Sequence, residues 1–175
     1  MKQNITIEDL NSLTFSQKQT LKSLWLPAKY DRAIASVCKD AENDIYEDLE
    51  FVVGEVVLSH GTTITLKRLR LPDDFVVDEE LPVHDEESTE EDCYDCAFDP
   101  GDYFLKENCL PLLNIGQLIT FIRTTKAGQD GFSLIIPPTN GFESEQGFVI
   151  NDRFGEVERA DELVDLLFKI LKEQL

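Results

Sequence analysis

The sequence lacks the short motifs that mark common catalytic and nucleotide-binding sites. It contains no G-x-x-x-x-G-K-[ST] phosphate loop, no G-x-G-x-x-G fingerprint and no H-E-x-x-H zinc pair. Only two histidines are present, and His60 falls in a predicted turn. Ser59 beside it does not make a triad, because no third group is identified that would orient the histidine. We therefore assign no catalytic residue.

Long apolar runs are also missing. No segment approaches the roughly 20 apolar residues that cross a bilayer, and Met1 to Asn4 lead into no apolar signal core. Four cysteines are too few and too irregularly spaced for the disulfide framework of a small secreted protein. We expect a soluble, cytoplasmic protein with no membrane partner, whose cysteines are thiols or metal ligands.

Basic residues are scarce. The chain has 16 Lys and Arg against 35 Asp and Glu, which gives a net charge of −19. This charge disfavours direct binding to nucleic acid and makes basic protein surfaces the natural partners. Solubility alone is the alternative explanation. With 175 residues, of which 42% are apolar, the chain is long enough for one core. We predict a single α+β domain over residues 1–175.

Hydrophobic periodicity predicts helices in three places. Residues 5–27 read as a short helix, a turn and a second helix that Pro27 ends. Thr14 and Gln17 form a capping box for the second helix, and its expected buried face contains Leu21, Leu24 and Trp25.

The other two helices lie in the C-terminal half. Asn114 and Gln117 predict a capping box at the start of the middle helix, whose buried stripe comprises Ile115, Leu118, Ile119 and Ile122, with Leu113 able to pack on Leu118. Residues 157–175 predict an amphipathic helix with acids in its first turns. Its apolar face comprises Leu163, Leu166, Leu167, Ile170 and Leu171.

Two hairpins are expected between these helices. Residues 49–58 and 62–71 form the clearest one, with His60-Gly61 as the turn and a bulge near Arg68. Segments 131–138 and 145–152 are further strands that pair together or extend the first hairpin. The sequence does not decide whether residues 28–48 form a strand or a helical turn. The predicted fold is a small antiparallel sheet packed by the N-terminal helical pair, the middle helix and the C-terminal helix.

The acidic residues are concentrated in one tract. Residues 71–105 contain 14 Asp or Glu, three prolines and no Lys or Arg. We predict an acidic, mobile loop over 72–102. A surface dense in carboxylates can compete for the basic groove of a nucleic-acid-binding protein, whereas a solvated loop that only aids solubility is the alternative. The expected partner-binding residues are Asp85, Glu86, Glu87, Glu90, Glu91 and Asp92.

The same tract contains a C-x-x-C pair, Cys93 and Cys96. His84 lies nine residues before it and Cys109 thirteen after it, so these four side chains are candidate ligands for a tetrahedral zinc ion. A second ligand pair, which strong zinc motifs contain, is missing. A redox role is less consistent with an acidic loop, because nearby carboxylates raise thiol pKa values. Plain cysteines with no cofactor remain the alternative.

Three segments carry a resemblance to a group of proteins. "ITIEDLNSLTFSQKQTLKSLWLP", "NCLPLLNIGQLITFI" and "ELVDLLFKILKEQL" cover about a third of the chain. They resemble small acidic proteins encoded by phages and prophages of Firmicutes-type bacteria. The resemblance implies a phage or prophage origin, a bacterial host cytoplasm and no known catalytic residue. It also implies structural roles for Gln117, Leu112, Leu113 and Leu118. The first hairpin and the C-x-x-C loop lie outside it.

Three functions follow as hypotheses. The first is a non-enzymatic accessory protein that binds a basic host protein through its acidic surface, such as an inhibitor of a nucleic-acid-acting defence enzyme. The second is a zinc-stabilised adaptor that recruits partners by its hairpin edge or its C-terminal helix. The third is a hydrolase that uses carboxylates and a divalent metal.

Overall fold

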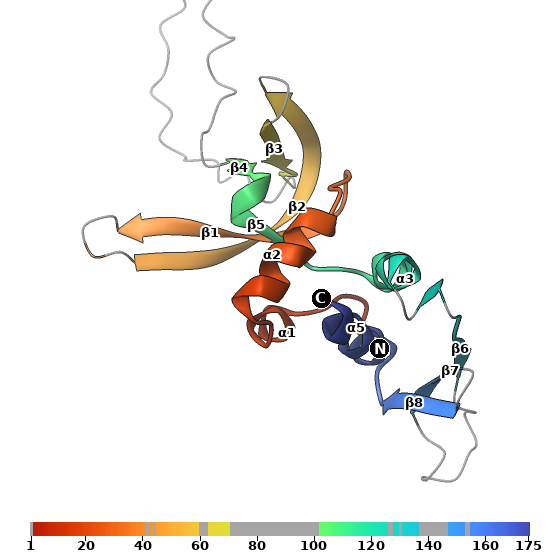
Figure 1. The fold of residues 1–175 in the computed structure, drawn as a ribbon. Helices are drawn as coiled ribbons and strands as arrows, with labels where there is room; N and C mark the ends of the chain where they lie inside the picture. The colour runs from red at the N-terminus through yellow and green to blue at the C-terminus, as the bar shows by residue number, and fades with distance from the viewer. Residues whose placement is uncertain are drawn as a thin grey trace, which may run out of the picture.

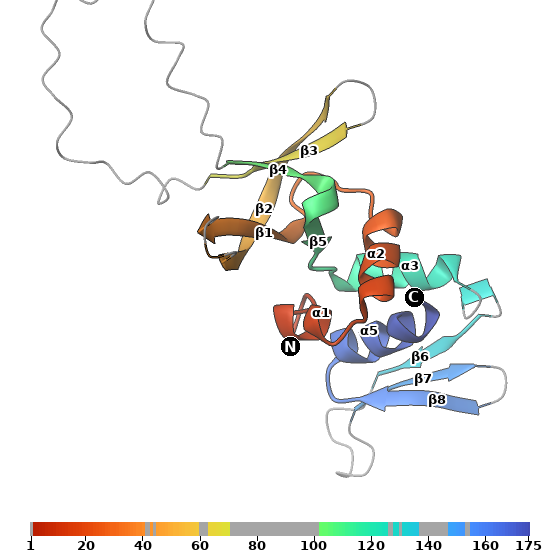
Figure 2. The same ribbon diagram turned by 60° about the vertical axis from the view of Figure 1, so that its left-hand side comes forward.

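The protein has an α+β fold in which helices lie between two antiparallel sheets (Figures 1 and 2). The computed structural model describes residues 2–40, 43, 45–59, 63–70, 102–125, 128–129, 131–136, 147–152 and 155–175. The predicted class is confirmed, although the strands form two sheets and not one. None of the described helices is long and apolar enough to cross a membrane.

The N-terminal helical pair forms as the local signals predict. Helix α1 (Ile7–Asn11) and helix α2 (Phe15–Leu24) both begin with a capping box, and Thr14 and Gln17 supply the second. The predicted face of α2 is only partly correct. Leu21 and Trp25 are 0% and 1% exposed, but Leu24 is 40% exposed because it lies on the side of the helix turned away from the core.

Helix α3 (Ile115–Thr124) begins with the predicted capping box, and its Leu118 and Ile122 are buried. Helix α5 (Leu163–Gln174) packs against α3. The predicted start of the C-terminal helix at residue 157 is wrong, because residues 155–160 form a strand. Pairing with a neighbouring strand satisfies the backbone groups of this segment, which local periodicity does not reveal.

A five-stranded antiparallel sheet forms one side of the molecule. Its order is β4-β3-β2-β1-β5, and its strands are β1 (Arg32–Asp40), β2 (Ile45–Ser59), β3 (Thr63–Arg68), β4 (Tyr103–Leu105) and β5 (Cys109–Pro111). The predicted hairpin is β2–β3, whereas β1 occupies the segment that sequence left open. A 3₁₀ turn, η4 (Lys106–Asn108), connects β4 to β5. The long β2 bends so that one half pairs with β1 and the other with β3 (Figure 1).

The predicted bulge lies at the expected level of the hairpin but in the other strand. Val53 pairs with Arg68 and Glu55 pairs with Lys67, so Gly54 is the extra residue. A Cβ at Gly54 would lie 3.0 Å from the Cα of Leu69. Glycine therefore allows the close backbone approach at which β2 changes partners.

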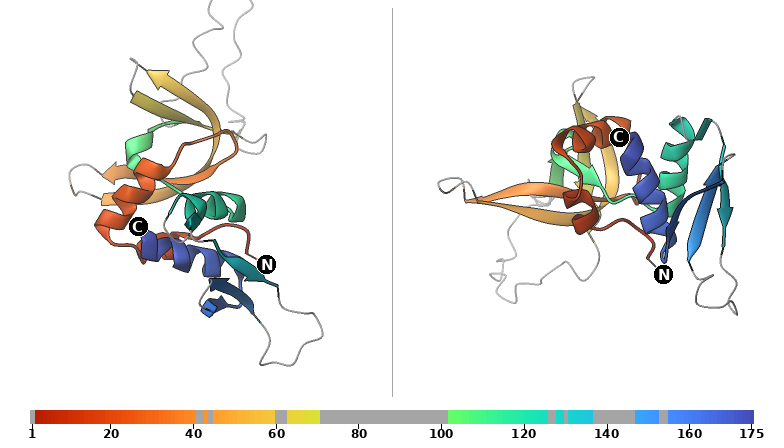
Figure 3. Two further views of the ribbon diagram at one scale, coloured as in Figure 1. Left: turned by 45° about the vertical axis from the view of Figure 1, so that its right-hand side comes forward. Right: turned by 60° about the horizontal axis from the view of Figure 1, so that its bottom comes forward.

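A three-stranded sheet covers the opposite side of the helices (Figure 3). Its order is β6-β7-β8, formed by β6 (Ser133–Ile135), β7 (Phe148–Asp152) and β8 (Gly155–Ala160). The predicted pairing of the two strand candidates is confirmed in β6–β7. Helix α5 contacts both β7 and β8, so the C-terminal helix joins this sheet to the helical layer.

Two hydrophobic clusters support these layers. The larger one, which we call the helical core, includes Leu118 and Leu167 and is built mainly from the four helices with help from β7. The smaller one, the sheet core, surrounds Trp25 and Phe51 on the inner face of the five-stranded sheet. Phe121 of α3 packs against both. The expected burial of Trp25, Leu118 and Leu167 is confirmed.

Candidate functional site

Most of the predicted site residues lie outside the described part of the chain. This applies to the six partner-binding acids, Asp85, Glu86, Glu87, Glu90, Glu91 and Asp92, and to the candidate zinc ligands His84, Cys93 and Cys96. Their predicted roles, and the mobile loop over 72–102, stay predictions. The structure does describe both ends of the acidic tract, at residues 70 and 102.

The two ends of the tract are held together. The Nε of Arg70 lies 2.5 Å from the Oδ2 of Asp102. Asp102 is 9% exposed, which makes it a buried member of the predicted acidic loop and not a surface group. Immediately beyond it, Tyr103 of β4 pairs with Lys67 of β3. The tract therefore leaves and rejoins the fold at neighbouring strands.

Aromatic packing secures the same region. The rings of Phe104 and Phe51 lie 4.6 Å apart between centroids, and Phe104 packs against the sheet core. The Nζ of Lys67 lies over the ring of Tyr103, 5.5 Å from its centroid. The strand that returns from the tract is thus fixed by packing as well as by pairing.

We call the junction of Arg70 and Asp102 the root of the acidic tract. Charge is unevenly distributed between the tract and the rest of the chain. Residues 71–101 carry 13 of the 35 acids and none of the 16 bases, which leaves 22 acids and 16 bases for the rest of the chain. Lys67, Arg68 and Arg70 lie just before the tract, on β3 and the residues that follow it. Most of the excess negative charge is therefore attached at one point of the five-stranded sheet.

A second acidic feature is a two-stranded projection that we call the arm, formed by residues 36–40 of β1 and 45–50 of β2. Strand β2 contains four acids, Glu47, Asp48, Glu50 and Glu55, and no base. Lys39 forms an ion pair with Glu47 and Arg32 forms one with Glu50. The arm and the root of the tract belong to one sheet, away from β6–β8 (Figure 1).

Cys109 is the one candidate zinc ligand that the structure describes. It is buried in the sheet core, and its thiol donates a hydrogen bond to the carbonyl of Leu105, with Sγ and O 3.3 Å apart. Burial raises the pKa of Cys109 to about 12. A protonated core thiol differs from the accessible thiolate that zinc requires. Among the described residues, no group of three or more His, Cys, Asp or Glu could hold a metal ion.

A hollow of about 470 Å³ lies between α2 and α3. Leu24, Trp25, Leu26 and Phe121 form its apolar walls, and the remaining described lining comes from Asn114, Gly116, Gln117 and Thr120. No Asp, Glu, His, Lys or Arg is among these described lining residues, so this hollow offers no general acid or base.

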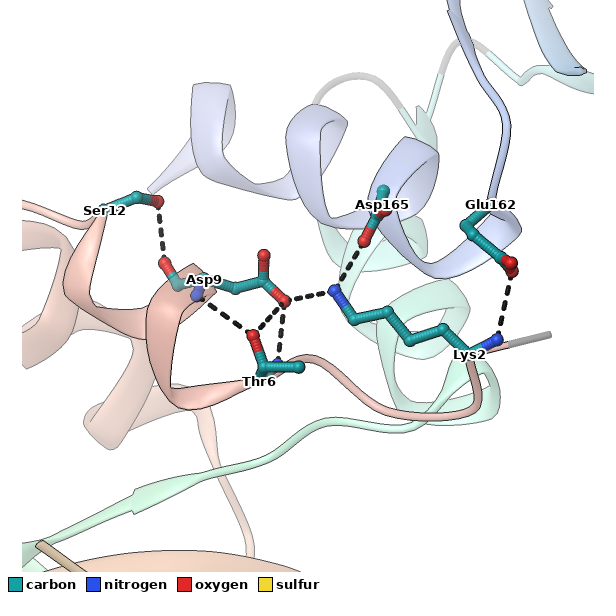
Figure 4. A network of polar contacts seen from close by, with 6 residues as sticks. All are labelled: Lys2, Thr6, Asp9, Ser12, Glu162 and Asp165. Atoms are coloured by element: carbon teal, nitrogen blue, oxygen red, sulfur yellow. Dashed lines mark hydrogen bonds and ion pairs between the residues drawn. The ribbon is translucent and has the colours of Figure 1, made fainter.

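Sequence reasoning missed a polar network that fastens the N-terminal segment to α5 (Figure 4). The Nζ of Lys2 lies 2.6 Å from a carboxylate oxygen of Asp9 and 2.6 Å from one of Asp165. The backbone N–H of Lys2 donates to Glu162 at 3.0 Å. Partial burial by itself raises the pKa of Asp9, but hydrogen bonds from Lys2 and from the Thr6 backbone outweigh burial and lower it.

A second missed group is Asp31, which links Trp25 of the sheet core to Gln117 of α3. Its Oδ2 accepts a hydrogen bond from the indole of Trp25 at 3.0 Å, and its Oδ1 accepts one from the side-chain amide of Gln117 at 2.8 Å. Gln117 also closes the capping box of α3. The sequence signals the cap, but not the contact with a residue 86 positions earlier.

Comparisons with known proteins identify no relative that could assign a role to these residues. No protein-family model matches the chain, and no curated protein or solved structure is significantly similar to it.

Proposed function

We propose that the protein is a non-enzymatic phage or prophage accessory protein that binds a basic host protein through the acidic side of its five-stranded sheet. The observation that carries the proposal is the attachment of a tract with 13 acids and no base at the closed Arg70–Asp102 root. The arm adds further carboxylates to the same sheet. The tract and the arm thus attach their negative charge to the same sheet.

Charge attraction acts while the protein and its partner approach each other. Charges of one sign attract an opposite surface over a distance set by screening, about 8 Å at physiological salt. Attraction of this kind raises association rates more than it slows dissociation. The closed root attaches both ends of the tract to the same part of the sheet, so we expect its carboxylates to act on one partner surface.

A nucleic-acid-acting defence enzyme of the host is the partner class that fits best. Such enzymes present Lys and Arg in grooves that accept phosphates spaced about 1.7 Å apart along the duplex axis. Carboxylates of the tract would occupy that groove and exclude the nucleic acid. Direct nucleic-acid binding by the chain itself is disfavoured by its net charge of −19.

The experiment is a pull-down from a host lysate at low salt, followed by kinetics with the purified partner. We expect a basic protein whose capture falls steeply as salt rises, and whose nucleic-acid binding the protein inhibits competitively. Capture that does not change with salt, or inhibition that nucleic acid does not relieve, would contradict the proposal.

A further inference from the structure

The two outer edges of the arm have no partner strand among the residues that the structure describes. Strand β5 pairs with β1 only opposite Ala33 to Ala35, and β3 pairs with β2 only from Val53 onward. Beyond these points no other described strand pairs with the outer edges of the arm. Two views show the arm extending away from the helical layer (Figures 1 and 3).

Hydrogen bonds beside the arm fix the direction of the backbone groups of β2. Val53 donates its N–H to the carbonyl of Asp31 at 2.8 Å and accepts from the N–H of Tyr30 at 2.7 Å, both on the β1 side. The carbonyl of Val52 accepts from the N–H of Leu69 at 2.7 Å, on the opposite side. The backbone N–H and C=O groups of successive β2 residues therefore point to opposite sides of the strand, one residue toward β1 and the next away from it.

The same alternation continues into the arm. Between residues 45 and 53 the register of β2 against β1 has no extra residue in β2. Since backbone groups alternate along an antiparallel strand, the N–H and C=O of Tyr46, Asp48 and Glu50 point to the open edge. Those of Glu47 and Leu49 point to β1. At every second residue, this edge thus presents an N–H and a C=O that no described strand pairs with.

The side chains of these three edge residues share one face of the arm. Tyr46 is 60% exposed. Asp48 is exposed and has no ion pair or hydrogen bond among the described residues, whereas Glu50 pairs with Arg32. A strand added to this edge would place its own side chains directly opposite them. Lys or Arg opposite Asp48 and Glu50 would form favourable cross-strand pairs.

We infer that the outer edge of β2 is a β-augmentation site for an extended basic segment of the partner protein. Backbone hydrogen bonds from Tyr46, Asp48 and Glu50 supply affinity, and a Lys or Arg at every second position of the incoming segment supplies specificity. This inference rests on the proposed function for the basic character of the partner, but it concerns a different element from the acidic tract.

The charge of the β2 edge favours a basic segment of the partner protein over a second copy of this chain. Pairing of two β2 edges would bring Asp48 and Glu50 of one copy against the acids of the other, and like charges directly opposite are destabilising. Charged residues along an edge are a known protection against self-association. The same acids that exclude a second copy attract a basic strand.

The test uses the full-length protein and a synthetic, terminally blocked peptide of about nine residues that alternates Lys and Val, a length typical of strands. Amide hydrogen exchange is followed by NMR. We expect the peptide to slow exchange at Tyr46, Asp48 and Glu50 by about tenfold or more, because these amides become hydrogen-bonded. Exchange at Glu47 and Leu49, which already pair with β1, should change little.

Two variants separate backbone pairing from charge attraction. Asp48→Pro removes an N–H that points to the open edge and takes no part in the β1–β2 ladder, so the fold should tolerate it. Asp48→Asn removes the same charge and keeps the N–H. We expect the proline variant to abolish protection of the edge amides and the asparagine variant to retain it with weaker binding. Unfolding curves of both variants verify that the fold persists.

Two results would overturn the inference: unchanged exchange at the three edge amides, or peptide binding by Asp48→Pro equal to that of Asp48→Asn. A variant in which Asp85, Glu86, Glu87, Glu90 and Glu91 are replaced by Ser distinguishes this site from the tract. Edge protection by the peptide should persist in that variant. Failure of the edge therefore leaves the tract to be tested separately, and failure of the tract leaves the edge intact.

Discussion

At the scale of single residues, Lys2 connects two ends of the chain that are distant in sequence. Partial burial by itself lowers the pKa of Lys2, but hydrogen bonds to Asp165 and Asp9 outweigh burial and raise it. The pKa of Asp9 is lowered, so its contribution to stability is present above its ordinary value of 3.8 and is lost as pH falls through the folded value. The contribution of Lys2 is present below 10.5 and is lost as pH rises through its folded value.

Replacing the ammonium tests this arrangement. In Lys2→Met the pKa of Asp9 should rise toward its ordinary value, since the cation that stabilises the carboxylate is gone. NMR titration of the side-chain carboxyl carbon measures it. Lys169→Met is a matched control, because Lys169 lies 2.6 Å from Glu158. It should raise the pKa of Glu158 and leave that of Asp9 unchanged. An unaltered Asp9 titration in Lys2→Met would show that the ion pair is not formed in solution.

Buried leucines define the helical core at the same scale. Leu118 and Leu167 are both fully buried, so Leu118→Ala and Leu167→Ala should each lower the free energy of unfolding by about 2–5 kcal/mol. Leu24→Ala, at a position 40% exposed on α2, should cost less than about 1 kcal/mol. Urea denaturation measures all three. Equal, small losses at the three positions would refute the assignment of the core.

At the scale of elements, Gly54 allows β2 to serve two neighbours. A Cβ there would lie 3.0 Å and 3.1 Å from the backbone Cα and N of Leu69, which cannot move as easily as a side chain. We expect Gly54→Ala to lower the free energy of unfolding by about 1–3 kcal/mol. The exposed neighbour Glu55 offers a control. Glu55→Ala should change the free energy of unfolding by no more than about 0.5 kcal/mol. A neutral Gly54→Ala would mean that the two strands separate more easily than their pairing indicates.

The elements differ in how far sequence predicted them, for a physical reason. Capping boxes are local, so Thr14 with Gln17 and Asn114 with Gln117 located two helix starts directly. Strand β8 was missed because its backbone N–H and C=O groups pair with β7. The local pattern of acids before an apolar helix contains no signal of that pairing. Strand β1 was left open for the same reason, since its partners β2 and β5 lie later in the chain.

At the scale of the whole molecule, composition predicted the acidic tract but not its attachment. The run of acids without a base is visible in the sequence. The pairing of Arg70 with Asp102, 32 positions apart, and the open edge of the arm depend on how strands assemble. The link from Lys2 to Glu162 spans 160 positions and has no local signal at all. Contacts between residues so far apart in the sequence can be identified only from the tertiary structure.

In the proposed function, the acidic tract provides the charge that attracts a basic partner. A five-residue Ser variant of the tract, at Asp85, Glu86, Glu87, Glu90 and Glu91, lowers the magnitude of the net charge by five. A control variant makes the same change at acids outside both the tract and the strands of the five-stranded sheet, namely Glu8, Glu143, Glu145, Asp161 and Glu173. The two variants have equal net charge and differ only in where the charge is removed.

Association kinetics of the two variants and the wild type with the captured host partner, at low and at high salt, test the claim most directly. We predict that the tract variant associates about tenfold more slowly than wild type at low salt, with a much smaller change in dissociation, because long-range attraction acts during encounter. The control variant should stay close to wild type, and high salt should reduce wild type to the rate of the tract variant. Equal association rates for the tract variant and the wild type at low salt would contradict the account.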